Sequence, residues 1–453
     1  MDELPVVTSS TQRFHHARRF VEGPIERLMN QPWRPGGTSA LTATIVGSFL
    51  VRLGGAATGV MLGLLLSSMH RRGVANSSVM VVSLLMAVYY LSELAGAPIA
   101  GLLIDRRGLR PLLFAGPVLG VIATAMIGAP TSVGLLTGAR LLQGLTTACT
   151  VPAALAYLSD VTDAAGRGRG RLMGFFEAGS IGGLAVGYVV GGLLWDRLDR
   201  QGFWDLILVY GAAAALFLLV QVERGKRLKR PPSATWRALR QTGDLVPSWL
   251  ALSAAAGLWF GQAAYQLSGA HPRPHQLLTL GFSGSTIGLI FGVYTLLFAT
   301  GTIGWGLLIG RLSTSTAMRI GTLGVLAAAA ALLGVNHGEG FHGPWFVVVL
   351  VLGVGSLAAE TAFTPAALTL LAAKSDGIPE GRGAVMGVYS MLLGAGQLIG
   401  AVLGGLFARP WGVDGLIVAT AIMGLVGLLT LPSDRPLISP LGKPAEWQAE
   451  AGT

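Results

Sequence analysis

Five ionisable side chains interrupt long apolar segments of the chain: Arg52, Glu93, Arg140, Glu177 and Glu360. A charge at the centre of a hydrocarbon layer costs roughly 2.5–3.5 kcal/mol on insertion scales, so these residues are expected to face a polar interior or a partner. Both arginines lie in the first half of the chain, and Glu360 is the only one of these five residues in the second half. We therefore predict that Glu360, or Glu93, carries a proton or anchors a cation. Buried ion pairing alone is the alternative for each residue.

A second set of candidate side chains lies on one face of an apolar segment in the second half. Gln262, Tyr265 and Gln266 are spaced by three and four residues, which places them on the same side of a helix, with Trp259 one turn before them. Amide, phenol and indole groups in this arrangement can contact a small amphipathic molecule. Hydrogen bonds between helices are the alternative. Gln143 is a further candidate of the same kind.

Membrane-spanning helices must position these residues, because the chain is too apolar for a soluble protein. Of its 453 residues, 52% are hydrophobic and 12% are charged, whereas soluble proteins carry about 25% charge. Apolar segments of 18 or more residues recur, each long enough to cross ~30 Å of hydrocarbon. Twelve spans are predicted, at residues 41–69, 79–104, 112–129, 133–158, 171–195, 203–222, 249–268, 283–309, 317–335, 344–372, 383–408 and 413–431.

Basic residues are distributed unequally around these spans. With both termini in the cytoplasm, the inner tails and loops hold 24 of the 32 Lys and Arg residues, and the outer loops hold six. This bias follows the rule that cytoplasmic loops are enriched in Lys and Arg. The formal net charge of +10 therefore indicates topology rather than a nucleic-acid partner. We predict a multi-pass protein of the plasma or inner cell membrane with both termini cytoplasmic.

The two halves of the chain repeat each other. Residues 169–193 align without gaps to 382–406 at an offset of 213, and the same offset pairs PAAL at 152–155 with PAAL at 365–368. Two related six-helix halves with a binding site between them near the midplane are typical of membrane transporters. The predicted fold is an all-α integral membrane protein with twelve transmembrane helices in two pseudo-symmetric six-helix bundles.

The repeat also fixes the predicted domain boundaries. A basic segment between the sixth and seventh spans separates the two bundles. The divisions are a cytoplasmic N-terminal tail at 1–40, an N-terminal bundle at 41–222, a cytoplasmic central loop at 223–248, a C-terminal bundle at 249–431 and a cytoplasmic C-terminal tail at 432–453.

The loop between the second and third spans carries a motif. In the stretch GLLIDRRGLRP its residues are Gly101, Asp105, Arg106, Gly108 and Arg110. This stretch resembles motif A of the major facilitator superfamily. Arginine, glutamine and glycine at positions 140, 143 and 144 resemble motif B of that superfamily, and SDVTDAAGRGRG resembles its loop before the fifth helix.

Gly183, Gly187 and Gly191 lie in a segment that resembles motif C of the drug:proton antiporters, with Tyr188 where that motif has a proline. Small residues at this spacing let two helices approach closely, so we predict that the three glycines pack helices. By these motifs the chain is identified as a member of the major facilitator superfamily, most like its twelve-helix drug:proton antiporter branch.

The resemblance implies a gate at the cytoplasmic side. Asp105 is expected to accept backbone N–H bonds at the start of the eleventh helix, near Gly381–Gly383, where the helix dipole favours an anion. Arg106 is expected to pair with Asp160 at the end of the fourth helix. These contacts would hold the cytoplasmic side shut while the interior faces outward.

The resemblance further implies a secondary active transporter that works by alternating access and exports small amphipathic or cationic compounds in exchange for protons. It implies a monomer in the lipid bilayer, with the proton gradient as the energy source and with no cofactor or metal. Import of a metabolite such as a sugar or organic acid is the alternative, and the two intramembrane arginines would suit an anion. The GFSG sequence at 281–284 matches the nucleophile motif of intramembrane serine proteases, but no histidine lies within a span as a base, so no enzyme is expected.

Overall fold

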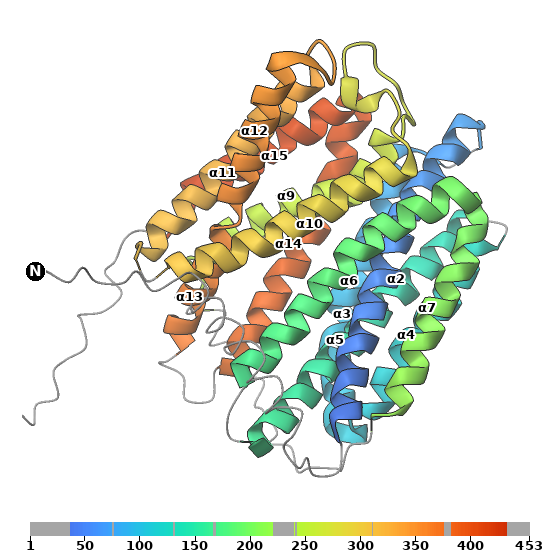
Figure 1. Ribbon diagram of the computed structural model, residues 1–453, viewed down its shortest axis with the longest axis vertical. Coiled ribbons are helices and arrows are strands. Elements are labelled where there is room, and N and C mark those ends of the chain that lie inside the picture. The colour runs from blue at the N-terminus through green and yellow to red at the C-terminus, as the bar shows by residue number, and fades with distance from the viewer. Residues whose placement is uncertain are drawn as a thin grey trace, which may run out of the picture.

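The computed structural model describes residues 37–74, 77–129, 132–165, 169–220, 240, 242–309, 311–375 and 382–432, and within these ranges it contains helices and no strands (Figure 1). The predicted tails, most of the central loop and the side chains at 162–171 and 372–389 lie outside the described residues. The helices are α2 Gly37–Arg71, α3 Val79–Arg107, α4 Arg110–Gly128, α5 Val133–Ala165, α6 Arg169–Leu198, α7 Gly202–Leu218, α9 Val246–Leu267, α10 Gly284–Leu308, α11 Thr314–Asn336, α12 Gly343–Glu360, α13 Phe363–Ser375, α14 Arg382–Trp411 and α15 Val413–Leu429, with short 3-10 turns η1 Asp199–Gln201 and η2 Leu277–Thr279.

These helices confirm the prediction of an all-α membrane protein, and helix is present at each of the twelve predicted spans. Within the described residues, nine segments are long and apolar enough to cross a membrane. One of the nine, at 172–218, joins the fifth and sixth predicted spans, while α9 and the 17-residue α15 are not among them. The count of twelve transmembrane helices therefore stays a prediction.

The tenth predicted span, 344–372, is not one helix. α12 ends at Glu360 and α13 begins at Phe363. Pro365 has no N–H to donate to the carbonyl of Thr361, and the Thr361 hydroxyl donates to the Ala358 carbonyl at 2.7 Å in competition with the backbone. The break places Glu360 at a helix end rather than in mid-helix, while residues 343–371 together still form one segment long and apolar enough to cross a membrane.

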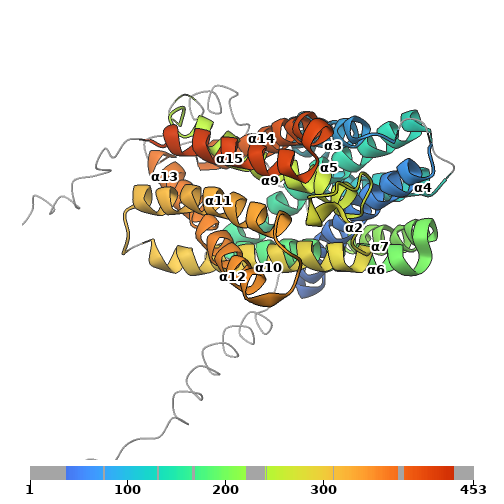
Figure 2. The same ribbon diagram turned by 90° about the horizontal axis from the view of Figure 1, so that it is seen from above.

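The helices form two groups. The first group, α2–α7, is blue to green in Figure 1, and the second group, α9–α15, is yellow to red. They meet chiefly along two helix pairs, α6 with α10 and α3 with α14. Smaller contacts join α2 with α9, α3 with α9, and α2 with α10. Figure 2 shows the first two of these pairs along opposite edges of the molecule. Any site shared by the two groups must lie among these six helices.

The apolar core is shared between the groups at one end of the molecule and divided at the other. Clusters that contain Met61 and Leu64 include side chains of both groups. A further shared cluster, of Met86, Tyr90 and Ala401, joins α3 to α14. Clusters around Leu113 and Leu371 each belong to a single group. We call the end where the core is shared the sealed end.

The sealed end contains residues 57–85, 194–206, 258–284 and 408–417. We call the opposite end, where the predicted basic loops lie, the basic end. The basic end contains residues 100–113, 213–220, 245–250 and 363–371. The groups are therefore packed together at the sealed end and have separate cores at the basic end.

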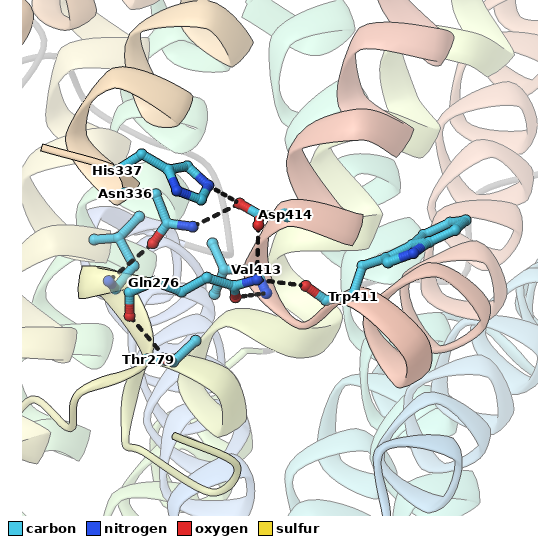
Figure 3. A network of polar contacts seen from close by, with 8 residues as sticks. Gln276, Thr279, Asn336, His337, Trp411, Val413 and Asp414 are labelled. Carbon is cyan, nitrogen blue, oxygen red and sulfur yellow. Dashed lines mark hydrogen bonds and ion pairs between the residues drawn. The ribbon is translucent and has the colours of Figure 1, made fainter. Parts of the chain in front are cut away.

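A polar network fixes the loop between α9 and α10 to the second group (Figure 3). The Asp414 carboxylate accepts hydrogen bonds from the Asn336 amide at 2.8 Å and from the Gln276 amide at 2.7 Å, and it contacts His337 Nε2 at 2.8 Å. The Gln276 carbonyl oxygen accepts from the Val413 N–H at 3.1 Å, at the start of α15. Because its middle is tied to α11 and α15, this loop moves with the second group.

The same loop contacts α2 of the first group. The rings of His70 and His271 lie 3.9 Å apart between centroids, and the Arg71 guanidinium donates to the Ser268 carbonyl at 2.6 Å. Burial, followed by the charges of His70 and Arg273, lowers the pKa of His271 from its usual value of 6.5. The sealed end therefore holds a neutral imidazole where the two groups touch.

Acidification should loosen this contact. Opening the sealed end returns His271 to water and to its usual pKa, so the open form binds a proton more readily than the closed form. The contribution of His271 to closure is fully present above about pH 6.5 and is lost as the pH falls below that value. Spin labels at Val74→Cys and His275→Cys, in a Cys149→Ser background, should show a larger population of long distances at pH 5.5 than at pH 7.5. His271→Gln should remove the effect of pH, and equal distances at both pH values would contradict the expectation.

Candidate functional site

Arg140 is held between α3 and α5 of the first group. It is 2% exposed, and its Nη1 donates to the Gln143 carbonyl oxygen at 2.6 Å. Its Nη2 contacts the Met86 sulfur, and its guanidinium lies over the Tyr89 ring, 5.0 Å from the centroid. Arg140 Nε and Gln143 Nε2 are buried without a partner among the described residues. The predicted motif-B pair is thus adjacent and keeps two donors that a polar ligand or water can use.

Arg52 of α2 and Glu93 of α3 lie close enough for their charges to interact. The Arg52 charge acts on the Glu93 carboxyl, and Tyr89 lies within hydrogen-bonding reach of that carboxyl. The Tyr89 hydroxyl also contacts the Thr147 hydroxyl at 3.1 Å. Arg52 Nε is buried with no partner in the described part of the chain. Tyr89 therefore links the two predicted charged groups to the Arg140 contact.

Glu360 lies in the second group, half-buried at the end of α12. The Tyr294 hydroxyl of α10 donates to Glu360 Oε1 at 3.5 Å. The Trp305 indole N–H donates to the Ala358 carbonyl at 2.8 Å, which fixes the end of α12 against α10. Among the described residues, no basic side chain acts on the Glu360 carboxyl. The Glu360 carboxyl therefore has a hydroxyl neighbour and no basic neighbour within the described part of the chain.

Four aromatic rings connect Glu360 to the first group. Tyr188 of α6 stacks on Phe260 of α9 with 5.8 Å between centroids, and it lies 5.2 Å from Phe291 of α10. Phe260 also packs against Phe291 at 5.7 Å and against Tyr294 at 6.0 Å. We call Tyr188, Phe260, Phe291 and Tyr294 the aromatic cluster. Such faces attract cations and flat apolar molecules.

The sequence motifs did not identify the aromatic cluster. The only signal was Tyr188, which occupies the position of the proline in motif C. In the structure this tyrosine provides the first group's contribution to the cluster.

The predicted polar face of α9 is used in contacts between helices. The Gln262 amide donates to the Val79 carbonyl at 3.1 Å and to the Ser83 hydroxyl at 2.7 Å. The Tyr265 hydroxyl donates to the Ser77 carbonyl at 2.8 Å. These bonds join the two groups at the sealed end. Gln262 and Tyr265 thus make hydrogen bonds between helices, which was the alternative to contact with a small molecule.

The two other residues of that face differ from this pattern. The Trp259 indole N–H donates to the Thr420 hydroxyl of α15 at 2.8 Å, within the second group. Gln266 is 1% exposed, and both its amide atoms lack a partner in the described structure. Glu177 is exposed on α6 and is not brought to the charged or aromatic residues above.

The predicted packing glycines of α6 lie against the backbone of α2. A Cβ added to Gly183 would lie 2.5 Å from the Phe49 carbonyl oxygen, and one added to Gly191 would lie 2.6 Å from the Ala57 Cα. A Cβ added to Gly187 would overlap the Leu53 carbonyl oxygen. Only glycine fits these three positions at the present helix spacing.

The motif-A residues lie at the basic end of α3. Asp105 and Arg106 are exposed in its last turn, and Gly108 follows with φ 85°, a conformation that favours glycine. Arg110 Nη2 donates to the Leu218 carbonyl at 3.3 Å, and a Cβ at Gly101 would meet open space. The expected partners, the Asp160 side chain and the start of α14 near residues 381–383, lie outside the described residues, so the predicted gate stays a prediction.

Ser283, the residue of the GFSG match, has a structural role. Its hydroxyl accepts the Thr286 N–H at 3.2 Å as the N-cap of α10. No cluster of three or more His, Cys, Asp or Glu that could hold a metal occurs in the described ranges.

Comparisons with known proteins agree with this architecture. The Major Facilitator Superfamily profile matches residues 44–271 and 272–449. The chain is similar to the class C tetracycline resistance protein of Escherichia coli, with 32% identity over 174 residues, which are 38% of this chain and 42% of that protein. It is also similar to the chloramphenicol resistance protein of Pseudomonas aeruginosa, with 26% identity over 360 residues, 76% of this chain and 81% of that protein.

The match to the tetracycline resistance protein thus spans less than half of that relative's length. A solved structure of the nucleoside transporter NupG shares the fold, with a TM-score of 0.67 and 13% identity over 86% of this chain and 97% of that one. The profile covers nearly all of the helical region and the fold agrees with it. The chain belongs to the Major Facilitator Superfamily and is a membrane transport protein, not an enzyme.

Proposed function

We propose that the chain exports small amphipathic cations in exchange for protons by alternating access between its two groups of helices. The observation that carries this proposal is the half-buried Glu360 carboxyl, which has an aromatic neighbour and no basic partner among the described residues. A carboxylate beside aromatic faces attracts organic cations through charge and through cation–π contact. The similarity to drug resistance proteins supports export.

Competition at one carboxyl provides the exchange. When Glu360 is protonated, the site is neutral and a cationic substrate leaves. When the proton leaves, the carboxylate binds the next cation. The aromatic cluster holds the apolar part of the substrate through stacking, and Tyr294 orients the Glu360 carboxyl. Glu93, which lies near the charge of Arg52, is the second position on the proton path.

The rest of the arrangement belongs to the same proposal. The chain acts as a monomer in the cell membrane with both termini cytoplasmic, needs no cofactor, and uses its two bundles, 41–222 and 249–431, as the moving parts. In this description the sealed end faces outward and the basic end faces the cytoplasm, because the predicted basic loops lie at the basic end.

Import of an organic acid is a second candidate function. It is favoured by buried donor atoms without a described partner on the first group, namely Arg52 Nε, Arg140 Nε and Gln143 Nε2. Three donors and two positive charges suit a carboxylate or sulfonate. This alternative would place the substrate on the first group rather than against Glu360.

Proteoliposomes separate the two functions. Vesicles acidified inside and carrying a trapped pH dye should lose their proton gradient when ethidium, an aromatic cation, is added outside to the protein in its exporting orientation. Naphthalene-2-sulfonate, an anion of similar size, should have no effect. If the sulfonate acidifies the lumen further, as cotransport of the anion with protons requires, and ethidium gives no response, the importer is supported and cation export is contradicted.

A further inference from the structure

Asp196, at the sealed end of α6, binds the start of α10. Its two carboxylate oxygens accept the backbone N–H groups of Gly284 and Ser285, each at 2.7 Å. The Ser283 hydroxyl accepts the next N–H, that of Thr286. The first N–H groups of α10 are therefore satisfied in part by a side chain from the other group of helices, at the helix end where the dipole favours an anion.

The contact lies at a close crossing between the two groups. A Cβ on Gly288 would lie 3.2 Å from the Tyr188 carbonyl carbon, and one on Gly292 would lie 2.7 Å from a Val189 methyl. Since α6 and α10 approach at glycines along this crossing, they cannot separate at the sealed end while Asp196 stays bound.

We propose that Asp196 is a latch that holds the sealed end shut and that it alternates with Asp105 at the basic end. The proposal rests on alternating access as the mode of transport. Both aspartates follow the apolar part of a first-group helix. Asp196 is bound to the N-terminus of α10, and the family resemblance implies that Asp105 binds the N-terminus of α14 in the other arrangement. One latch must open before the other end can close.

The repeat explains why the sealed end has one such latch rather than two. The offset of 213 residues places Arg409 of α14 at the position of Asp196. α14 packs against α3 as α6 packs against α10. A guanidinium is repelled by the N-terminus of a helix, so Arg409 cannot make the equivalent contact. Because Asp196 and Arg409 carry opposite charges at repeat-related positions, this contact is present between α6 and α10 and is not repeated between α14 and α3.

Removal of the Asp196 charge should shift the conformational equilibrium without unfolding the chain. Asp196 is exposed, so its carboxylate remains hydrated when the latch opens. A charge at a helix N-terminus under these conditions changes an equilibrium by roughly two- to fivefold. Asp196→Asn should therefore raise the ratio of sealed-end-open to sealed-end-closed molecules by about this factor.

Spin-label distances at both ends test the proposal on the full chain in nanodiscs without substrate. One label pair, Val74→Cys with His275→Cys, reports the sealed end, and a second, Arg107→Cys with Arg311→Cys, reports the basic end. Each pair is placed in the Cys149→Ser background. Asp196→Asn should lengthen distances at the sealed end and shorten them at the basic end in the same sample.

Two further variants make the result specific. Asp199→Asn is the matched control, because Asp199 is another exposed acid three residues away that contacts Arg72 at 3.7 Å within the first group. It should leave both distance distributions unchanged. Asp105→Asn should shift the populations in the opposite direction, and the double variant Asp196→Asn with Asp105→Asn should return them close to the starting ratio.

The proposal is overturned if Asp196→Asn leaves the sealed-end distances unchanged, or lengthens them without any change at the basic end, since the latter would be local loosening. These distances need no substrate. Failure of ethidium transport would therefore contradict cation export and leave the latch unaffected, whereas unchanged distances would contradict the latch alone.

Discussion

Glu360→Gln should abolish proton-coupled export of a cationic substrate while leaving the protein folded. The substitution keeps the size of the side chain and removes the negative charge beside Tyr294. A hydrogen bond or contact to a charged group is worth roughly 1.5–3 kcal/mol, so the affinity for a cation should fall by about ten- to a hundredfold. Because the glutamine side chain cannot exchange a proton, ethidium should no longer dissipate an imposed pH gradient.

Thermal stability separates this loss from misfolding. The Glu360 carboxyl is half-buried and no described basic side chain acts on it, so a neutral amide should not lower the melting temperature in detergent. Glu339→Gln is the matched control, since Glu339 is an exposed acid in the loop before α12. It should transport normally. If Glu360→Gln retains coupled flux and ethidium affinity, Glu360 is neither the proton carrier nor the cation anchor.

Tyr294→Phe should have a smaller effect on substrate binding than Glu360→Gln. It removes the hydroxyl that contacts Glu360 at 3.5 Å and keeps the ring that packs on Phe260. Affinity for ethidium should change by only a few-fold, because the carboxylate and the aromatic faces remain.

Most of the helical architecture could be predicted because the thickness of the hydrocarbon layer fixes the length of apolar segments, and because topology fixes which loops are rich in Lys and Arg. Apolar length located helix at every predicted span, and the family motifs indicated the fold that the structure has. The break after Glu360 could not be predicted in this way. It depends on one threonine hydroxyl and one proline inside a continuous apolar segment, and neither residue makes that segment less apolar as a whole.

The charged part of the candidate site was accessible from the sequence for the same reason. A charge in an apolar segment is rare and costly, so Arg52, Glu93, Arg140 and Glu360 were identified by position alone. The aromatic cluster was not identified, because tyrosine and phenylalanine are as frequent on lipid-facing surfaces as in an interior. Their meeting depends on how α6, α9 and α10 are rotated against each other.

The conformation of the molecule could not be predicted from the sequence. The sequence of a protein that alternates between two conformations contains the residues for the contacts of both. No sequence pattern indicates which conformation is the more populated one. Motif A indicated a latch at the basic end, whereas the structure has its shared core and the Asp196 contact at the sealed end. The polar face of α9 could be located, but its partners Ser83 and Ser77 belong to this one arrangement.

Gly187→Ala should destabilise the protein more than the same methyl group added to α6 at Gly174, Gly179 or Gly182, where the new Cβ would meet open space or a side chain at 3.4 Å or more. The new Cβ would overlap the Leu53 carbonyl oxygen and lie 2.8 Å from the Leu53 Cα, and backbone atoms cannot rotate away as a side chain can. α2 and α6 must move apart to accept it, which costs roughly 1–3 kcal/mol by analogy with overpacked cores. The melting temperature in detergent should fall by several degrees, and Gly187→Leu should give little folded protein.

Gly211→Ala of α7 is the matched control for this prediction. It adds the same methyl group to another helix of the same group, at a position where the Cβ meets no atom within 4 Å. Alanine favours helix over glycine by ~1 kcal/mol, so this variant should melt at or above the temperature of the parent protein. A lower melting temperature in Gly187→Ala but not in Gly211→Ala would place the cost in the α2–α6 contact. Equal melting of both variants would mean that the two helices can separate freely, and the close approach of α6 to α2 would then not stabilise the first group.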